Sequence, residues 1–219
     1  MNTLTVPPLS DLLPRLFAEA DASDAACAAA KSQLSPAERL ARVTSATGYR
    51  AYYAEAKDFY LAVSRETGKL LYLLARAAQA RSIVEFGTSF GISTLHLAAA
   101  VRDNGGGQVI GSEFEPAKAA KARENFAAAG LSDLIELREG DALETLATGL
   151  PQTVDMILLD GAKALYGPIL RLLEPHLRAR GLIVADNADL SKDYLAHVRG
   201  CGRFVSLPFG KDVELSMKL

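Results

Sequence analysis

Apolar and polar positions change their pattern near residue 82 of the 219-residue chain. From there on, short and almost uniformly apolar runs alternate with stretches of helical character, such as 116–129 and 166–178. The apolar runs cover residues 83–86, 108–112, 134–139, 156–160, 182–185, 204–208 and 213–218. Apolar strands that alternate with helices are typical of a parallel sheet covered on both faces. The pattern therefore predicts an α/β fold.

The last two apolar runs are separated by residues 209–212 alone. A crossover between parallel strands needs about a dozen residues, so this pair is predicted to form an antiparallel hairpin. The expected architecture is a Rossmann-like doubly wound sheet, mostly parallel, with an antiparallel C-terminal strand. We expect this domain to span residues 61–219, with residues 1–60 as an N-terminal helical cap.

Helices are predicted throughout the first 80 residues. Ser10 is suited to cap the first helix, and a separate alanine-rich piece follows at 22–33. Ser35 and Glu38 have the spacing of a capping box at the start of another helix. A further helix is expected at 66–80, directly before the first strand.

Composition and charge narrow the class of partner. The formal net charge is −2 and the basic residues are scattered, which disfavours nucleic acid and anionic membranes as partners. No apolar run approaches the ~20 residues of a membrane-spanning helix, and the first residues do not resemble a signal peptide. Cys27 and Cys201 have no metal-binding spacing, so reduced thiols in a cytoplasmic protein are expected.

The loop after the first predicted strand has few side chains and follows a carboxylate. In SIVEFGTSFGIST, residues 82–94, Glu85 precedes Gly87 and Gly91, and Ser93 follows. The G-x-x-x-G spacing fits neither a dinucleotide fingerprint nor a phosphate loop. Glu85 would repel a pyrophosphate and would suit a ligand that carries a cationic amino group.

Acidic residues also end the next two predicted strands. Glu113 follows Gly87 by 26 residues and is placed to accept hydrogen bonds from a ribose diol. Asp141 ends the following strand and could meet an adenine amino group. A ligand with adenine, ribose and a cationic amino-acid tail, but no phosphate, describes S-adenosylmethionine. The alternative interpretation is that these acids are ordinary strand-end polar residues and helix caps.

Two later strand ends are predicted to form a metal site. Asp160 ends one strand and Lys163 follows it, while Asp186 and Asn187 end the next strand. Two carboxylates and an amide suit a hard divalent cation such as Mg²⁺. Taken singly, Asp160 could instead cap a helix, and the Asp-Asn pair could form a turn.

These motifs together resemble the metal-dependent class I O-methyltransferases of the catechol and caffeoyl-CoA group, over about 61–190. The resemblance implies a divalent cation (Mg²⁺, or Mn²⁺ or Ca²⁺) and a homodimer. It implies transfer of a methyl group from S-adenosylmethionine to a hydroxyl of a catechol-like, phenolic or other vicinal-oxygen small molecule. The cofactor-binding residues implied by it are Val63, Glu85, Gly87, Thr88, Gly91, Ser93, Glu113, Asp141, Ala142 and Asp160, the metal ligands Asp160, Asp186 and Asn187, and the catalytic residues Lys163 and Asp160. In this scheme the metal orients and acidifies a chelated hydroxyl, Lys163 takes its proton, and Glu85 holds the amino group of the cofactor.

The sequence departs from the family in two regions that would contact the acceptor. The segment 188–204 is short, and the first 60 residues match nothing in the family pattern. The acceptor therefore cannot be identified from sequence. Two alternatives stay open, namely a metal-independent methyltransferase of the same fold and a non-catalytic cofactor-binding module.

Some residues of chemical interest are expected to have structural roles. Tyr49, Tyr53 and Tyr60 share a face at helical spacing, and packing or a dimer contact is expected for them rather than an acceptor pocket. His96 and His176 are expected to be packing or helix-surface residues, because no partner is evident for them.

Overall fold

The computed structural model describes residues 2–32 and 34–219. One sheet of seven strands runs through the molecule in the order β3-β2-β1-β4-β5-β7-β6. The strands are β1 (Ser82–Phe86), β2 (Gln108–Glu113), β3 (Ile135–Glu139), β4 (Val154–Leu159), β5 (Leu177–Ala185), β6 (Phe204–Phe209) and β7 (Val213–Lys218). Each predicted apolar run is therefore a strand.

The strand directions agree with the predicted topology. β1 pairs in parallel with β2 and β4, and β3 and β5 extend the parallel sheet on its two sides. β7 lies antiparallel between β5 and β6, so the last two strands form the predicted hairpin. The fold is a Rossmann-like doubly wound sheet, and its strand order reverses between β1 and β4.

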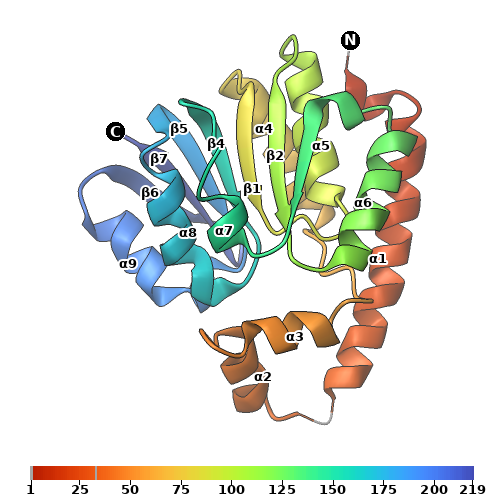
Figure 1. Cartoon of the computed structure of the whole chain (residues 1–219), viewed down its shortest axis with the longest axis vertical. Coiled ribbons are helices and arrows are strands. Elements are labelled where there is room, and N and C mark those ends of the chain that lie inside the picture. The colour runs from red at the N-terminus through yellow and green to blue at the C-terminus, as the bar shows by residue number, and fades with distance from the viewer. Residues whose placement is uncertain (1, 33) are drawn as a thin grey trace.

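Helices cover both faces of the sheet (Figure 1). The helices are α1 (Leu9–Lys31), α2 (Pro36–Val43), α3 (Tyr49–Glu55), α4 (Arg65–Ala77), α5 (Ile92–Asp103), α6 (Pro116–Ala128), α7 (Ala142–Thr145), α8 (Tyr166–Leu173) and α9 (Lys192–Gly200). Short 3₁₀ segments lie at Thr3–Thr5, Ser132–Leu134, Lys163–Leu165 and Ala188–Leu190. One apolar cluster joins α1, α4, α5 and α6 to the sheet, and a second joins α7, α8 and α9 to the opposite face.

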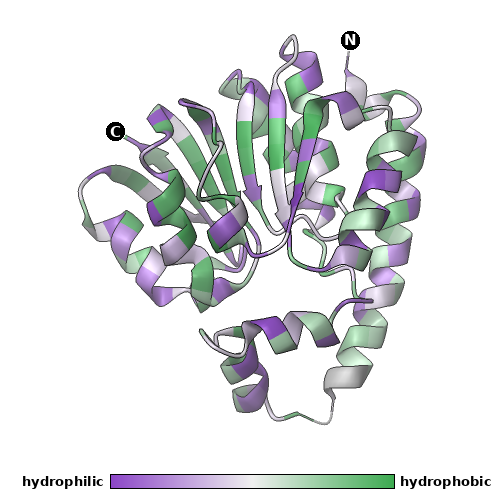
Figure 2. Ribbon diagram, in the orientation of Figure 1, coloured by the Kyte–Doolittle hydropathy of each residue, from purple (hydrophilic) through white to green (hydrophobic). Residues whose placement is uncertain are grey.

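Colouring by hydropathy shows why these layers form. The strands are largely apolar and the helices carry polar residues on their outer sides (Figure 2). Burying apolar surface between the layers is the main favourable contribution to the folding free energy. Among the described residues, no helix is both long and apolar enough to cross a bilayer.

The N-terminal segment differs from the prediction in two respects. The predicted first helix and alanine-rich piece are one helix, α1, which begins at Leu9. Ser10 is not its cap, because its own N–H already donates to the carbonyl of Val6 and its side chain contacts Asp11. The predicted end at Gln33 lies outside the described residues. The proposed boundary at residue 60 stays a prediction.

The other helix predictions hold with small shifts. Ser35 and Glu38 form the predicted capping box of α2. The helix expected at 66–80 is α4, which begins one residue earlier and ends three residues sooner, and whose N-cap is Ser64. The helix expected at 166–178 is wrong at its end, because α8 stops at Leu173. Pro175 follows it and β5 begins at Leu177.

Two short helices form an arm beyond the sheet. Figure 1 shows α2 and α3 below the end of the sheet at which the central parallel strands terminate. In the described residues of these two helices, no side chain is fully buried. The position of this arm in Figure 1 places it next to the carboxyl ends of the parallel strands, where ligands bind in open α/β folds.

Candidate active site

The glycine loop between β1 and α5 needs its two glycines. Gly87 has φ +97°, and a Cβ there would stand 2.6 Å from the backbone nitrogen of Gly161. Gly91 has φ +89°, and a Cβ there would overlap the ring of Phe126. Positive φ is costly for other residues, so the sequence G-x-x-x-G fixes a loop that packs tightly against its neighbours.

Glu85 at the end of β1 is fully buried and hydrogen-bonded by hydroxyl groups. Thr88 donates to it at 2.9 Å and Ser93 at 2.5 Å, and Thr94 is the third donor. Burial raises the pKa of Glu85 even though these three hydrogen bonds act in the opposite direction. The carboxyl group therefore anchors hydroxyl side chains of the loop and of the first turn of α5.

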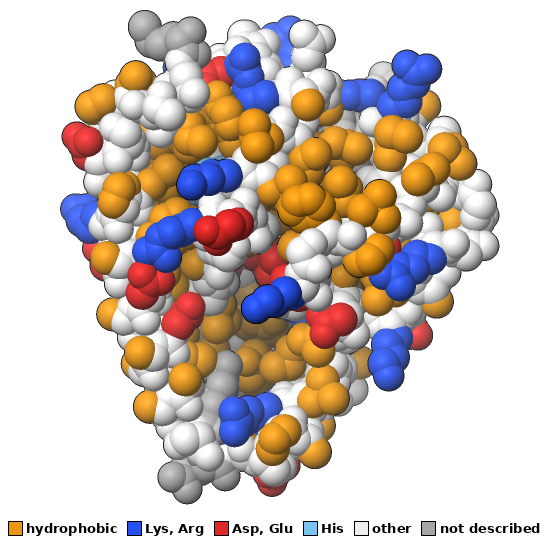
Figure 3. All heavy atoms as spheres, turned by 180° about the vertical axis from the view of Figure 1, so that it is seen from behind, with side chains coloured by type: hydrophobic (Ala, Val, Ile, Leu, Met, Phe, Trp, Pro, Cys, Tyr) orange, Lys and Arg blue, Asp and Glu red, His pale blue; other side chains and the backbone are white. Residues whose placement is uncertain are grey.

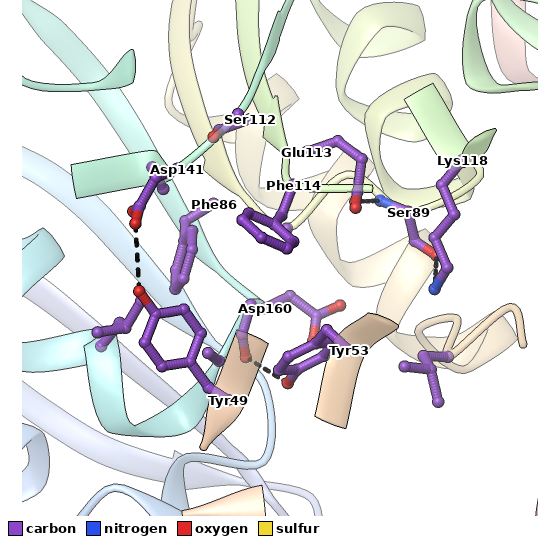
Figure 4. Close-up of a pocket in the computed structure, with 17 residues that line it drawn as sticks. Tyr49, Tyr53, Phe86, Ser89, Ser112, Glu113, Phe114, Lys118, Asp141 and Asp160 are labelled. Carbon is purple, nitrogen blue, oxygen red and sulfur yellow. Dashed lines mark hydrogen bonds between the residues drawn. The ribbon is translucent and has the colours of Figure 1, made fainter. Parts of the chain in front are cut away.

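Glu113 ends β2 and holds backbone amides. Its carboxylate accepts hydrogen bonds from the N–H of Ser89 at 2.6 Å and the N–H of Glu115 at 2.8 Å. Burial raises the pKa of Glu113, with the backbone hydrogen bonds and the charge of Lys118 opposing the shift. Figure 4 shows Glu113 beside Ser89 at the edge of the pocket.

Asp141 connects the sheet to the arm. Its carboxylate caps α7 through the N–H of Leu143 at 2.9 Å. It also accepts hydrogen bonds from Arg50 at 2.5 Å and from the hydroxyl of Tyr49 at 3.2 Å. Burial opposes ionisation, but these donors outweigh it and lower the pKa of Asp141.

Two small adjoining cavities lie where these strand ends meet. The first, of about 70 Å³, lies between α3 and the strand ends (Figure 4) and is lined by Tyr49, Tyr53, Leu61, Phe86, Gly87, Ser89, Ser112, Glu113, Phe114, Lys118, Gly140, Asp141, Ala142, Asp160, Gly161, Ala162 and Leu165. The second, of about 10 Å³, is lined by Tyr60, Leu61, Ala62, Val63, Gly87, Thr88, Ser89, Phe90, Ile92, Ser93 and Asp160. Eight of the ten residues predicted to bind the cofactor line one or both cavities. Within the described chain, Glu85 and Gly91 are not among the lining residues.

The expectation of packing holds for Tyr49 and Tyr53, which lie against the second apolar cluster, but both residues also line the first cavity. Tyr49 and Tyr53 point from α3 toward the strand ends and line the first cavity. The hydroxyl of Tyr53 donates to the carbonyl of Gly161 at 3.3 Å. Tyr60 packs as well, since its ring stacks on Phe90 with centroids 4.2 Å apart.

Asp160 and Lys163 form a buried ion pair at the end of β4. The Lys163 ammonium donates to Asp160 at 3.2 Å and to the hydroxyl of Tyr166 at 2.7 Å. Tyr166 in turn donates to the carbonyl of Asp186 at 2.7 Å. Burial raises the pKa of Asp160 to about 8, the charges of Asp186 and Glu85 add to the shift, and Lys163 opposes it.

Asp186 and Asn187 follow β5 and line an outer groove of about 450 Å³ with Asp212. Asn187 has φ +48°, and its side-chain amide donates to Asp212 at 3.1 Å. Burial raises the pKa of Asp186, while the charge of Lys163 opposes the shift. The predicted metal ligands thus lie on two neighbouring strand ends, with Asp160 facing the inner cavities and the other two facing the groove.

The donor atoms fit a hard divalent cation in kind. Asp160 and Asp186 are close enough for the charge of one to raise the pKa of the other, and a cation between them would relieve that repulsion. Among residues 2–32 and 34–219, no group of three or more His, Cys, Asp and Glu side chains is arranged to hold a metal. The predicted set has only two such side chains, Asp160 and Asp186, because its third ligand is the amide of Asn187.

Comparison with known proteins places this chain in a family. A methyltransferase domain model matches residues 84–188. Catechol O-methyltransferase of Niastella koreensis is 38% identical over 141 residues, which cover 61% of this chain and 61% of that protein. Catechol O-methyltransferase of Sus scrofa is 30% identical over 172 residues, which cover 73% of this chain and 89% of that protein. The chain belongs to the catechol O-methyltransferase-like family of class I S-adenosylmethionine-dependent O-methyltransferases.

Solved structures of O-methyltransferases share this fold. The crystal structure of the O-methyltransferase TomG from Streptomyces achromogenes, in complex with S-adenosylmethionine, is 26% identical. It superimposes with a TM-score of 0.65 and covers 86% of this chain and 93% of that chain.

Three residues that shape the site are absent from the cofactor-binding, metal-binding and catalytic residues predicted from the sequence. Tyr166 holds Lys163 from a position one helical turn away, and Tyr53 reaches the cavity from the arm. Gly111, in the middle of β2, leaves room for the hydroxyl of Thr88 that donates to Glu85, since a Cβ there would overlap that oxygen. A glycine inside a strand is a sequence signal for such close approach.

Proposed function

We propose that this protein is an S-adenosylmethionine-dependent O-methyltransferase that requires a divalent metal and methylates a hydroxyl of a catechol-like or other vicinal-oxygen small molecule. The observation that carries the proposal is the position of Asp160. It lines both inner cavities, is paired with Lys163, and is electrostatically coupled to Asp186. Donor methyl and acceptor oxygen would meet at this point.

The cofactor would lie along the two inner cavities. Glu113 and Asp141 line the larger cavity and are assigned to the ribose and the adenine amino group. Val63, Thr88 and Ser93 line the smaller one and are assigned to the methionine end. Glu85 would support this end through the hydroxyls of Thr88 and Ser93, since both donate to it. Gly87 and Gly91 would shape the loop, and Ala142 would contact the cofactor beside Asp141.

Lys163 is proposed as the group that receives the proton of the acceptor hydroxyl. Its ammonium is held between Asp160 and Tyr166 in a water-poor site, with the residue 5% exposed. It would have to release its own proton before it could act as a base. Tyr166 fixes its position beside Asp160, the residue at which donor and acceptor are proposed to meet.

Asp160, Asp186 and Asn187 are proposed to hold the cation. When bound, a divalent cation would lower the pKa of a chelated hydroxyl and orient it. For Asn187 to join the set through its amide oxygen, its nitrogen can keep the hydrogen bond to Asp212, because the two atoms point in different directions. This geometry supports Mg²⁺, Mn²⁺ or Ca²⁺ as candidates.

The test separates three outcomes. Calorimetric titration with S-adenosylhomocysteine, with and without Mg²⁺, measures cofactor binding, and a panel of catechols measures methyl transfer with and without chelator. Binding together with chelator-sensitive methylation is expected. Methylation that is unaffected by chelator would replace the proposal with a metal-independent methyltransferase of the same fold. Binding with no methylation of any acceptor, unchanged by Lys163→Ala, would favour a non-catalytic module.

We propose a homodimer that forms through the outer face of the β6–β7 hairpin. β6 is the edge strand, and Val205, Leu207, Phe209 and Met217 expose 36–52% of their surface on this hairpin. Figure 3 shows a broad apolar cluster on the half of the rear face where this edge lies. In monomeric proteins an edge strand is normally protected by charged side chains or by a helix or loop packed over it. A second copy of this chain would cover β6 in the same way.

A further inference from the structure

The roof of the larger inner cavity comes from the arm formed by α2 and α3. Tyr49 and Tyr53 are four residues apart, so they lie on one face of α3. Both point toward the strand ends, and both line the cavity that also contains Glu113 and Asp141 (Figure 4). Tyr53 also donates to the carbonyl of Gly161, the residue after Asp160, so this helix contacts the end of β4 as well.

The cavity beneath this roof is too small for a nucleoside. Its volume is about 70 Å³, whereas clefts that bind small molecules have volumes of roughly 300 Å³ or more. The inference rests on the proposed function, because it takes this cavity as the site of the adenosyl group. For such a ligand to enter, the tyrosine rings and the helix that carries them must move.

The arm is fastened in a way that permits this movement. No side chain of the described residues in α2 and α3 is fully buried. A separate cavity of about 350 Å³ lies within the arm, against residues that include Leu34, Arg42 and Phe59. In α3, Tyr49 and Tyr53 alone among the described residues pack against the second apolar cluster. A segment held by so few apolar contacts is among the parts of a fold that open at low free energy.

Two of the polar contacts that hold α3 to the sheet end at Asp141, the carboxylate that the ligand is proposed to use, and a third joins the hydroxyl of Tyr53 to the carbonyl of Gly161. Arg50 donates to Asp141 at 2.5 Å, and the hydroxyl of Tyr49 donates to the same oxygen at 3.2 Å. The Arg50 side chain is 60% exposed and is not among the residues that line the cavity. Arg50 therefore closes the roof from outside and occupies an oxygen that an adenine amino group would need.

We infer that α3 is a movable roof of the cofactor pocket, that Tyr49 and Tyr53 contact the bound adenosyl group, and that the Arg50–Asp141 ion pair is its latch. Ligand entry breaks the latch, and the adenine amino group then replaces Arg50 at Asp141. A protein that is mostly latched binds its ligand more slowly and more weakly, because only the open fraction is competent.

The latch is tested by the kinetics of S-adenosylhomocysteine binding to the full chain. In stopped-flow measurements, Arg50→Ala should raise the association rate constant about two- to fivefold, the factor expected for loss of one exposed ion pair. Tyr53→Ala should raise the dissociation rate constant, because a roof contact is lost. The matched control is Arg42→Ala, which removes the 3.0 Å pair with Glu55 inside the arm and leaves Asp141 untouched. Its association rate constant should equal that of the wild type.

Hydrogen exchange supplies a second readout. Saturating S-adenosylhomocysteine should slow amide exchange in residues 49–55 of the wild type, and Arg50→Ala without ligand should exchange faster there. If ligand binds but association is equal in wild type and Arg50→Ala, or exchange in α3 does not respond, the roof inference is overturned and the proposed function stands. If wild type and all variants fail to bind the ligand, the proposed function itself fails.

Discussion

At the scale of single residues, Gly91 and Gly105 have the same backbone angle and different surroundings. Both have φ +89°, but a Cβ at Gly91 would overlap the ring of Phe126, whereas a Cβ at Gly105 would meet nothing within 4 Å. Gly91→Ala should therefore lower the free energy of unfolding by about 2–4 kcal/mol, and Gly105→Ala by about 1 kcal/mol. Urea titration of the two variants measures the difference. Equal losses would mean that the contact with Phe126 adds nothing.

Lys163 gives a prediction about activity at the same scale. Lys163→Ala should lower kcat about 10²- to 10⁴-fold, the usual range for loss of a positioned proton acceptor, and leave binding of S-adenosylhomocysteine within a few-fold of wild type. Tyr166→Phe is the companion variant, because it removes the 2.7 Å hydrogen bond that positions Lys163 and keeps the amine. Its kcat should fall less, and its pH–rate profile should shift. A Lys163→Ala enzyme with wild-type kcat would exclude the proposed role.

At the scale of secondary-structure elements, local sequence signals predict the strands and most helices. Each apolar run is followed directly in sequence by the polar residue that ends it. The sequence alone is therefore enough to place Glu85, Glu113 and Asp160 at the carboxyl ends of their strands. The parallel-sheet rule brings those ends together. The capping box of Ser35 and Glu38 is local in the same way.

Contacts between distant segments explain what could not be predicted. Arg50 meets Asp141 across 91 residues of sequence, and neither the period of α3 nor its composition indicates that pairing. For the same reason the sequence predicts the packing of Tyr49 and Tyr53 but not their position at the cavity, since the arm could be placed over the strand ends only from its fold. The Ser10 prediction fails because the preceding residues extend the helix, which a cap preference does not exclude.

The C-terminal hairpin carries a buried charge that makes stability depend on pH. Glu214 on β7 is 1% exposed and accepts hydrogen bonds from Arg199 at 2.8 and 2.6 Å and from Ser206 at 2.6 Å. Burial opposes its ionisation, but these bonds outweigh the burial and lower the pKa of Glu214 below 4.5. A lowered carboxyl pKa stabilises the fold above the unfolded-state value, and this stabilisation is lost as the pH falls through the folded-state value.

Glu214→Gln should therefore cost about 1–2 kcal/mol near pH 7. The difference from wild type should shrink as the pH falls below about 4.5. Urea unfolding at pH 7, 5 and 4 measures the difference in unfolding free energy between Glu214→Gln and wild type at each pH. The control is Glu124→Gln, which removes a surface ion pair with Lys121 and should change the unfolding free energy little. A difference between Glu214→Gln and wild type that is independent of pH would show that the charge of Glu214 does not stabilise the fold.

At the scale of the whole molecule, one of the two edge strands of the sheet exposes an apolar face. β3 lies at one edge and β6 at the other. Along β6 the side chains alternate, so that Phe204 is buried in the cluster with α8 and α9 while Val205, Leu207 and Phe209 face outward. An edge strand with such an apolar face is a site at which another chain can pack.

Leu207→Glu should dissociate the proposed dimer, because two symmetry-related carboxylates would have to be desolvated against an apolar surface. Light scattering after size exclusion should give about twice the 23.3 kDa chain mass for the wild type and the single-chain mass for Leu207→Glu. Leu40→Glu on α2 is the matched control, since Leu40 is 50% exposed and Leu207 is 48% exposed. It should stay dimeric. A wild-type protein that is monomeric at all concentrations would contradict the proposed dimer. A dimer that persists in Leu207→Glu would show that the dimer interface does not include this face of β6.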